Sequence, residues 1–215
     1  MNIIRKIDNL FFGKYKDQYG KELVKLTNNI NSLLDLGCGN NSPVKFIKDK
    51  VKTRVGVDLF EPSIQKSLKA GIHNDFKMIN VLEIDQYFEP NSFDLVIASD
   101  LIEHLEKNDG FKLLDLMEKV ASKKVIILTP NGFLKQGVYD DNDFQIHKSG
   151  WTTEEFESRG YKVYGIMGAK WTRGEYSHPT VKPNPLGFRI SFLTQNAVFN
   201  NPKNAFALMA VKEIK

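Results

Sequence analysis

The stretch Leu33-Leu34-Asp35-Leu36-Gly37-Cys38-Gly39-Asn40 determines the fold that the chain is expected to adopt. An apolar run containing a single acid ends in a Gly-x-Gly sequence. The run predicts a buried parallel strand, and the glycines predict a tight turn where no Cβ keeps the backbone from a ligand. Ser42 and Pro43 then suit the N-cap and the first turn of a helix. A strand, a glycine turn and a helix N-terminus together predict a site for a nucleotide-like cofactor.

Two acidic residues, Asp35 and Asp58, indicate which kind of cofactor the turn could bind. Asp35 lies two residues before Gly37, and the third glycine usual in dinucleotide-binding enzymes is absent. A carboxylate in this place can accept a hydrogen bond from an ammonium group, or it can bond to the amides of the loop. Asp58 follows Gly39 by 19 residues (58 − 39) and ends an apolar run. An acid at this distance can accept from two ribose hydroxyls; the alternative is that it caps the helix beginning near Pro62.

Beyond residue 31 the chain alternates predicted strands and helices. Strands separated by helices predict parallel pairing with right-handed crossovers. Strands are expected at 32–36, 54–58, 76–80, 93–98, 124–128, 161–167 and 205–211, and helices at 43–50, 62–70, 111–120, 152–159 and 186–198.

The chain of 215 residues is expected to form a single domain. Its expected parts are an N-terminal helical cover (1–31), a cofactor-binding half (32–130) and an acceptor-side half (131–215). The cover is expected to form two amphipathic helices over the sheet. A lid over the site is the alternative role of this cover, and its candidate lid residues are Phe11, Phe12, Tyr15 and Tyr19.

The composition limits the classes of protein to which the chain can belong. Its hydrophobic content of 41% and charged content of 26% are ordinary for a globular protein. No apolar run approaches the ~20 residues that span a bilayer, and the N-terminus lacks the features of a secretory signal. The single cysteine, Cys38, excludes an internal disulfide. These features predict a cytoplasmic protein without a membrane span.

The charge pattern bears on metal ions and nucleic acid as partners. The net charge of +4 comes mostly from scattered lysines. The densest basic run, residues 48–54, has no interleaved aromatic residues, so it predicts a solvated helix end rather than a nucleic-acid patch. No group of cysteines and histidines has zinc-ligand spacing, so no metal site is predicted.

Two more stretches follow predicted strands at the same sheet edge. Asn80-Val81-Leu82 places a polar side chain next to apolar ones, a combination that suits the edge and the face of an adenine ring. Ser99-Asp100 follows the apolar run at 93–98. Because ligands of open α/β sheets bind at the carboxyl ends of the strands, both stretches are expected to lie beside the glycine turn.

The segments 33–40, 55–58, 80–82 and 93–105, in this order and spacing, resemble the class I methyltransferases that use S-adenosylmethionine. The resemblance covers most of residues 32–130 and implies ten cofactor-binding residues. They are Asp35, Gly37, Cys38 and Gly39 at the methionine part, with Asp35 supporting the ammonium; Asp58 at the ribose; Leu59, Asn80 and Val81 at the adenine, where Asn80 reaches the amino group; and Ser99 and Leu101 near the sulfonium.

The same resemblance implies a Rossmann-like α/β fold with a seven-stranded, mostly parallel sheet, an antiparallel last strand and helices on both faces. The chain departs from the family pattern in two places: Asn41-Ser42 replaces the usual glycine after the turn, and Asn80 replaces the commoner aspartate. The C-terminal half resembles small-molecule methyltransferases, including those of sugar and glycan biosynthesis, in residues 129–132, 145–151 and 155–161.

Histidines are the candidates for acid–base chemistry on the acceptor. Methyl transfer from a sulfonium is an in-line displacement, and a hydroxyl acceptor benefits from a base. His147 is the candidate catalytic residue, because it lies in the loop that this fold places over the cofactor; a loop-to-helix hydrogen bond is the alternative. His104 is expected to fix a helix start, and His73 is expected in a turn on the far side. Further acceptor-pocket candidates are Tyr139, Asp140, Asp143, Trp171 and His178.

The expected acceptor is a small molecule or a glycan, methylated on a hydroxyl group. Ser99-Asp100-Leu101-Ile102 replaces the Pro-Pro-aromatic pattern common in amine methyltransferases, and no Pro-Cys pair serves cytosine C5 chemistry. Three alternatives stay open: an RNA or protein methyltransferase, a catalytically silent S-adenosylmethionine-binding protein, and a nicotinamide oxidoreductase. The oligomeric state has no prediction.

Overall fold

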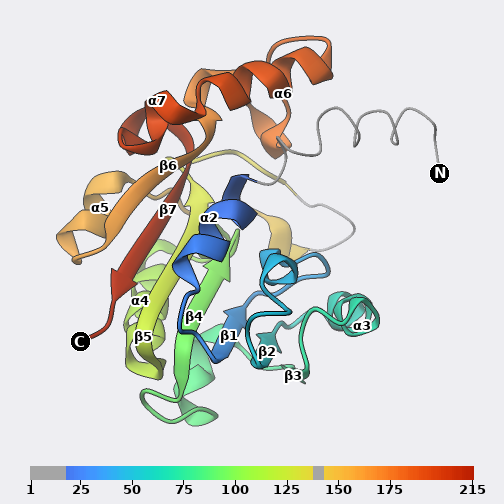
Figure 1. Cartoon of the computed structure of the whole chain (residues 1–215), viewed down its shortest axis with the longest axis vertical. Coiled ribbons are helices and arrows are strands. Elements are labelled where there is room, and N and C mark those ends of the chain that lie inside the picture. Colours follow the sequence, from blue (N-terminus) through green and yellow to red (C-terminus); the bar gives the residue numbers. More distant parts are fainter. Residues whose placement is uncertain (1–17, 138–142) are drawn as a thin grey trace.

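The computed structural model describes residues 18–137 and 143–215, with the side chains of Gln18 and Asp143 excepted. Seven strands form one sheet in the order β3-β2-β1-β4-β5-β7-β6 (Figure 1). β7 pairs antiparallel with both β5 and β6, and all the other pairings are parallel. This is the expected Rossmann-like sheet. The strands are β1 (Ser32–Leu36), β2 (Thr53–Val57), β3 (Asp75–Lys77), β4 (Phe93–Ser99), β5 (Ala121–Pro130), β6 (Lys162–Ala169) and β7 (Ala205–Glu213).

Helices and short 3-10 turns connect the strands. No helix among the described residues has the length and apolar character needed to cross a membrane. The α-helices are α2 (Gln18–Leu26), α3 (Glu61–Ala70), α4 (Lys107–Val120), α5 (Thr153–Ser158), α6 (Asn184–Leu193) and α7 (Gln195–Phe199). The 3-10 helices are η1 (Pro43–Phe46), η2 (Val81–Gln86), η3 (Ile102–His104), η4 (Asp143–Gln145), η5 (Lys170–Thr172), η6 (Glu175–Ser177) and η7 (Pro202–Asn204).

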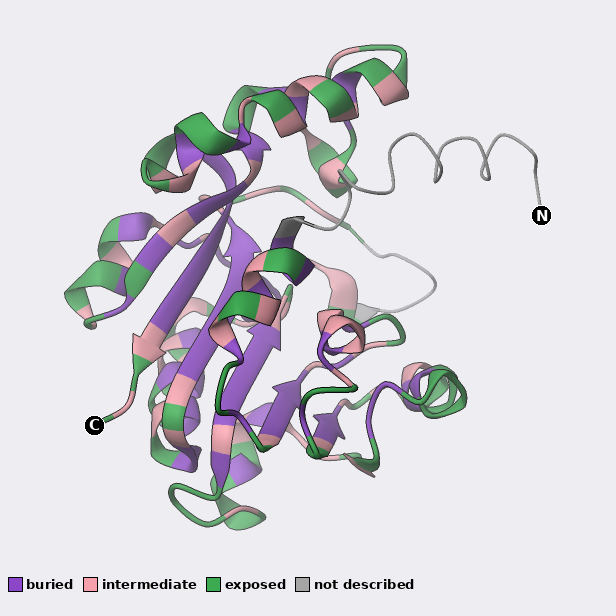
Figure 2. Cartoon of the chain, in the orientation of Figure 1, coloured by how far each residue is buried: buried purple, intermediate pink, exposed green. Residues whose placement is uncertain are grey.

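The alternation of side chains along the strands creates a hydrophobic core on each face of the sheet. In β1, Leu34 and Leu36 join the core that contains the α4 residues Leu113 and Met117. The intervening Leu33 joins the core on the other face, which contains Leu23 of α2. Figure 2 shows the central strands buried along most of their length, with helices on both sides. This double burial explains the continuous apolar runs in the sequence.

Three elements differ in type or are shortened or divided, while α4 and β5 begin four and three residues before the expected starts at 111 and 124. The strand expected at 76–80 is the short β3, because Asn80 leaves the sheet edge to cap η2 by accepting from the N–H of Leu82. A four-residue 3-10 helix, η1, forms where a helix was expected at 43–50. Ser42 caps its N-terminus, because the hydroxyl accepts from the N–H of Val44. The helix expected at 186–198 is divided into α6 and α7 at Thr194, whose hydroxyl bonds to the backbone of β6 and of α6.

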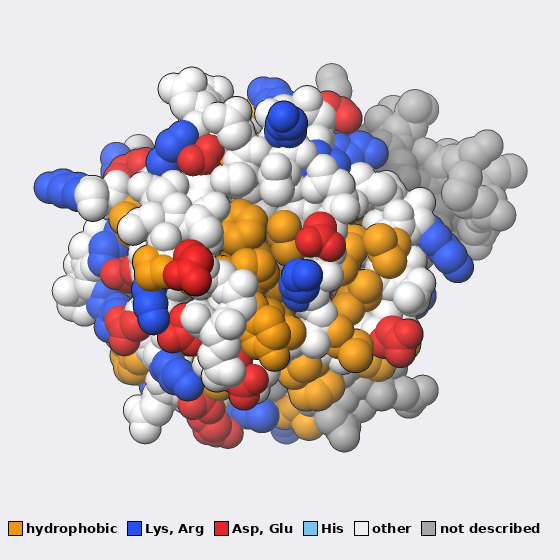
Figure 3. Space-filling model, turned by 90° about the horizontal axis from the view of Figure 1, so that it is seen from below, with side chains coloured by type: hydrophobic (Ala, Val, Ile, Leu, Met, Phe, Trp, Pro, Cys, Tyr) orange, Lys and Arg blue, Asp and Glu red, His pale blue; other side chains and the backbone are white. Residues whose placement is uncertain are grey.

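The surface seen from below Figure 1 has mixed character. In Figure 3 hydrophobic side chains gather near the centre of this face, and acidic and basic side chains are interspersed around them. Among the described residues on this face, the basic side chains form no continuous stripe. This face therefore offers nucleic acid no extended positive track.

Candidate functional site

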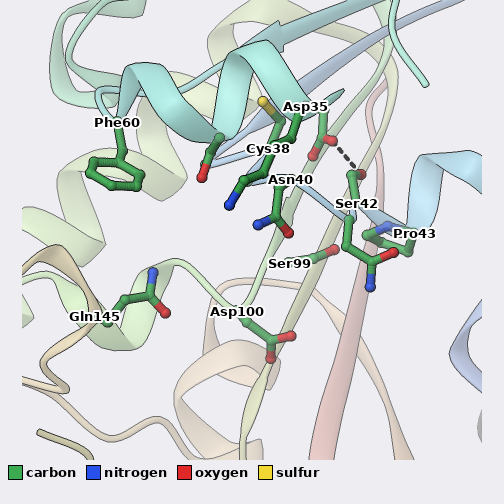
Figure 4. Close-up of a pocket in the computed structure, with 14 residues that line it drawn as sticks. Asp35, Cys38, Asn40, Ser42, Pro43, Phe60, Ser99, Asp100 and Gln145 are labelled. Atoms are coloured by element: carbon green, nitrogen blue, oxygen red, sulfur yellow. Dashed lines mark hydrogen bonds between the residues drawn. The ribbon is translucent and has the colours of Figure 1, made fainter. Parts of the chain in front are cut away.

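Two cavities lie at the carboxyl ends of the parallel strands, beside the glycine turn. The turn cavity has a volume of about 250 Å³ and is shown in Figure 4, and the apolar cavity has about 260 Å³. Gly37, Gly39 and Asp100 line both of them. Together they collect all ten residues predicted to contact the cofactor. The turn cavity is lined by Asp35, Gly37, Cys38, Gly39 and Ser99, and the apolar cavity by Gly37, Gly39, Asp58, Leu59, Asn80, Val81 and Leu101.

The glycine turn has a shape that side chains would resist. Gly37 and Gly39 have φ angles of 62° and 55°, in a region that residues with a Cβ rarely adopt. A Cβ on Gly37 would lie 2.7 Å from Cδ1 of Leu101. Cys38 between them is buried, and burial raises the pKa of its thiol. The turn therefore leaves backbone open to a ligand, while the Cys38 sulfur packs inside the protein and is not a nucleophile.

Asp58 follows β2 and fixes the other side of the turn. Its Oδ2 accepts from the N–H of Gly39 at 2.8 Å, and its Oδ1 accepts from the N–H of Phe60 at 2.8 Å. The carboxylate therefore connects the glycine turn to the backbone just before α3, and it is not a side-chain cap of that helix. It also lines the apolar cavity. Each oxygen keeps a lone pair for a ribose hydroxyl, since a carboxylate offers about four acceptor positions.

Asp35 is buried beneath the turn, where two side chains form hydrogen bonds with its carboxylate. Its Oδ2 accepts from the hydroxyl of Ser42 at 2.5 Å and lies 2.9 Å from Nε2 of His73 (Figure 4 shows the bond to Ser42). Nδ1 of His73 lies 3.2 Å from the hydroxyl of Ser67 in α3. The expectation that His73 lies on the far side is therefore wrong. The chain reverses at Gly71, in the left-handed region, and brings this buried ring against the acid under the turn.

Replacing His73 with alanine is expected to lower the free energy of unfolding by about 3 kcal/mol. The substitution leaves the buried Asp35 carboxylate without its imidazole partner, and an incompletely paired buried charge is costly. Urea denaturation measures the change. The exposed His178→Ala is the control and is expected to stay within about 0.5 kcal/mol of the wild type. Equal stability of His73→Ala and wild type would contradict the supporting role of this ring.

The walls of the apolar cavity include large hydrophobic side chains that solvent reaches. Leu59 is 45% exposed and Phe144 is 60% exposed, and both line the cavity together with the buried Val81. Exposed apolar groups gathered in one hollow are typical of a ligand site. Oδ1 of Asn80 accepts from the N–H of Leu82 at 3.0 Å. The oxygen keeps a second lone pair, which suits the adenine amino group implied by the resemblance, and the amide nitrogen can donate to a ring nitrogen.

Ser99, at the end of β4, connects the site to helix α2. Its Oγ lies 3.1 Å from the hydroxyl of Tyr19, a buried residue whose pKa is raised by removal from water. Of the four candidate lid residues, Tyr19 lies in the described part of the chain, and it contacts a predicted cofactor residue. Phe11, Phe12 and Tyr15 lie outside the described residues.

Asp100 lies where four cavities meet. It lines the turn cavity, the apolar cavity and two larger cavities: one of about 510 Å³, mostly on the acceptor half, and one of about 560 Å³ between the acceptor half and residues 19–128. Its φ of 50° lies in the left-handed region, and such strain in a non-glycine residue is often found at functional sites. The side chain is exposed to the cavities, and partial removal from water by the protein around it raises the pKa of its carboxyl group to about 6. The sequence placed Asp100 at this edge without a role; its position links the cofactor cavities to the acceptor half.

The cavity of about 510 Å³, here called the acceptor cavity, contains a cluster of one carboxyl group and two imidazoles. Three atoms that could bind a metal ion, one each from Glu103, His104 and His147, all lie within 4.8 Å of one another. The rings of His104 and His147 meet edge to face, with centroids 4.8 Å apart. The sequence pointed to His147 but not to its partners, which lie 43 and 44 residues earlier (147 − 104 and 147 − 103).

Hydrogen bonds orient both imidazole rings. Nδ1 of His147 lies 2.6 Å from the carbonyl oxygen of Leu134, and Nδ1 of His104 lies 3.3 Å from that of Ile146. Because a carbonyl only accepts, each Nδ1 carries the hydrogen and each Nε2 presents a lone pair. Imidazoles held in this way, beside the carboxyl group of Glu103, suit a divalent cation of the first transition row. The sequence predicted no metal site, and this cluster is the feature that it missed.

Burial sets the protonation of the cluster. Removal from water, and then the neighbouring His147, lower the pKa of His104 to about 4. Burial also lowers the pKa of His147. Burial, and then the charge of Asp100, raise the pKa of Glu103 well above its usual range. Both rings are therefore neutral near pH 7, the form that accepts a proton or binds a cation.

The remaining residues of the acceptor half are in varied environments. Trp151 is fully buried and stacks on Phe156, so it belongs to the core. His178 lines the acceptor cavity, and Trp171 is exposed. The predicted candidates Tyr139 and Asp140 lie outside the described residues, as does the side chain of Asp143.

Comparison with known proteins agrees with this geometry. Residues 34–132 match a family described as a methyltransferase domain. A small RNA 2'-O-methyltransferase from Tetrahymena thermophila is 28% identical over 166 residues, which cover 67% of this chain and 36% of that protein. The chain therefore spans about a third of the length of this curated relative.

Solved structures share the fold at low sequence identity. An S-adenosylmethionine-dependent methyltransferase from Archaeoglobus fulgidus superposes with a TM-score of 0.62 at 17% identity, covering 99% of this chain and 100% of that one. Magnesium protoporphyrin IX methyltransferase from Synechocystis PCC 6803, with S-adenosylmethionine bound, superposes with a TM-score of 0.56 at 13% identity, covering 100% and 85%. The comparisons therefore place a methyltransferase domain at residues 34–132, and the seven-stranded sheet shares its fold with the S-adenosylmethionine-dependent methyltransferase from Archaeoglobus fulgidus.

Proposed function

We propose that the protein transfers the methyl group of S-adenosylmethionine to a hydroxyl group of a small molecule or a glycan. The observation that carries the proposal is the position of Glu103, His104 and His147 in a cavity that adjoins the cofactor cavities at Asp100. A hydroxyl is a weak nucleophile, and it needs help in losing its proton. An amine acceptor with a free lone pair has less need of such a cluster.

The residues of the turn and apolar cavities hold and orient the cofactor. Asp58 accepts from the ribose hydroxyls, the glycine turn backs the methionine part, and Asp35 beneath it favours the ammonium group. Val81 and Leu59 enclose the adenine ring. This orientation points the methyl group past Ser99 and Leu101 toward Asp100, so that the acceptor approaches in line from the acceptor half.

The acceptor cluster holds the hydroxyl and its proton. The Nε2 lone pair of His147 suits either a proton or a cation, and the same holds for His104. Glu103, His104 and His147 would together hold a divalent cation. Such a cation supplies Lewis acidity that makes a bound hydroxyl easier to deprotonate.

A ribose 2'-hydroxyl of RNA is the second candidate acceptor. The similarity to the Tetrahymena small RNA 2'-O-methyltransferase favours it. The same hydroxyl chemistry serves both candidates, and so they differ only in what the acceptor half binds.

A tritium-transfer experiment tests the proposed acceptor. The protein is incubated with S-adenosylmethionine labelled in the methyl group and with a cell extract divided into small molecules, glycans, RNA and protein. Label is expected in the small-molecule or glycan fraction, and Asp58→Ala serves as the inactive control. Label confined to RNA supports the second candidate, label confined to protein contradicts both, and no label in any fraction supports a catalytically silent binding protein.

A further inference from the structure

Arg173 lines the cavity of about 560 Å³ that lies between the acceptor half and residues 19–128, here called the basic cavity. Ser99 and Asp100 line the same cavity, so it opens onto the cofactor site. The carbon of the guanidinium group lies 5.2 Å from the ring centroid of Phe188 and 6.0 Å from that of Phe206. Aromatic rings at these distances attract a flat cation and help to hold it in place.

The hydrogen bonds of Arg173 fix the group but do not neutralise it. Nε donates to the carbonyl of Met167 at 3.0 Å and to the hydroxyl of Ser191 at 3.0 Å, and Nη1 donates to the carbonyl of Ser177 at 3.2 Å. All three acceptors are uncharged. Within residues 18–137 and 143–215 no carboxylate forms an ion pair with Arg173.

Asp100 lines the same cavity, but among the described residues Arg173 has no ion-pair partner. Burial lowers the pKa of Arg173 to about 10, so the group stays protonated near neutral pH. A buried charge without a partner of opposite sign is costly, and proteins retain one mainly where a ligand supplies the partner. Lys45 and His178, two further basic side chains, line the same cavity.

Three residues near Arg173 have a left-handed backbone conformation. Met167 and Ser177, whose carbonyls accept from the guanidinium, have φ angles of 65° and 57°, and the neighbouring Tyr176 has 53°. Left-handed backbone in non-glycine residues costs free energy, and it clusters where a site needs fixed geometry. Three such residues around a cation that has no ion-pair partner in the described part of the chain therefore indicate a built binding site.

We propose that Arg173 binds an anionic group, a carboxylate or a phosphate, of a small hydroxyl-bearing acceptor, and so orients the hydroxyl toward Asp100 and the cofactor. Arginine suits both anions because its parallel N–H groups match their paired oxygens. The substrate class is then a sugar acid, a sugar phosphate or a similar hydroxylated anion. This inference rests on the proposed function for the direction in which the acceptor lies, whereas anion binding itself is measurable without turnover.

Nuclear magnetic resonance of the ¹⁵N-labelled protein tests the anion site. The Nε–Hε resonance of Arg173 is identified as the one that Arg173→Gln removes. Inorganic phosphate or sodium acetate is then added to the wild-type protein loaded with S-adenosylhomocysteine, with ionic strength held constant by sodium chloride. The resonance is expected to shift and to saturate at millimolar anion. Arg189, an exposed residue of α6, provides the control resonance and is expected to stay unchanged.

A charge-reversal variant separates binding from structure. Lys45→Glu introduces a carboxylate at the basic cavity and leaves every bond of Arg173 intact, so it is expected to raise the concentration needed for saturation about tenfold. Saturation by phosphate alone or by acetate alone supports the proposal and identifies the anion. An Arg173 resonance that neither anion moves overturns it, as does saturation by a short single-stranded RNA but by neither small anion. Failure of S-adenosylhomocysteine to bind is seen separately, in the backbone amides of Gly37 and Gly39, and counts against the proposed function instead.

Discussion

Substitution of Asp58 by alanine is expected to weaken the binding of S-adenosylhomocysteine about 100-fold or more. The carboxylate is the predicted partner of two ribose hydroxyls, and hydrogen bonds to a charged group contribute about 1.5–3 kcal/mol each. The same side chain holds the N–H groups of Gly39 and Phe60, so its loss also loosens the turn that receives the cofactor. Isothermal titration calorimetry of the two proteins measures the effect.

Asp75→Ala is the matched control for this experiment. Asp75 lies in the neighbouring strand β3, and its side chain is exposed and accepts from the N–H of Phe76. This variant removes the same charge and is expected to bind like the wild type. Far-ultraviolet circular dichroism checks that Asp58→Ala remains folded. If folded Asp58→Ala bound S-adenosylhomocysteine as tightly as the wild type, the prediction that Asp58 binds the ribose hydroxyls would be wrong.

The second large effect is expected at the acceptor cluster. Glu103→Gln and His147→Ala are each expected to lower the rate of methyl transfer by about 100-fold or more, the range of acid–base and metal contributions. Neither residue lines the turn cavity or the apolar cavity, so the affinity for S-adenosylhomocysteine is expected to stay within about twofold of wild type. The tritium-transfer assay and calorimetry measure the two quantities separately.

Removal of metal distinguishes the two ways in which this cluster can act. If it holds a cation, treatment with EDTA abolishes transfer and added Mn²⁺ restores it in the wild type but not in Glu103→Gln. Activity that survives EDTA assigns the proton transfer to His147 alone. Glu157→Gln, an exposed carboxylate of α5, is the control variant. Full activity in both Glu103→Gln and His147→Ala would contradict any role of the cluster in the reaction.

The sequence predicted the cofactor half because its signals are local. A glycine turn after an apolar run and an acid at the end of the next strand come from neighbouring elements of a parallel sheet. The topology then brings Gly39 and Asp58 to 2.8 Å of each other. The same logic placed Asn80 and Ser99 at this edge. Spacing along the chain was therefore sufficient, because strand order alone determines which loops meet.

The residues that the sequence misjudged depend on contacts that no local pattern encodes. His73 reaches Asp35 because α3 ends at Gly71 and the chain folds back under the turn. The cluster of Glu103 and His104 with His147 depends on the path of the loop after β5, where backbone N–H groups of residues 148 and 149 bond to the carbonyl of Glu103. Such contacts depend on the folded path of the loop, and the local sequence pattern does not predict that path.

The acceptor half also shows why side-chain type alone is a weak guide. Trp151 ends a stretch that resembles small-molecule methyltransferases, yet its ring fills the core beside Phe156. Arg173 drew no attention in the sequence, because a single arginine in a proline-rich stretch is ordinary. Its significance comes from its burial and from the absence of an ion-pair partner among the described residues, both of which are properties of the folded chain.

Calorimetric titration of the wild-type protein with S-adenosylhomocysteine tests the central claim most directly. The glycine turn, Asp58 and the apolar cavity together predict one site per chain with a dissociation constant in the micromolar range, a binding free energy of about −8 kcal/mol. Competition by S-adenosylmethionine for the same site is expected. No detectable binding of either compound to folded protein would contradict the assignment of these cavities to the cofactor, and with it the proposed reaction.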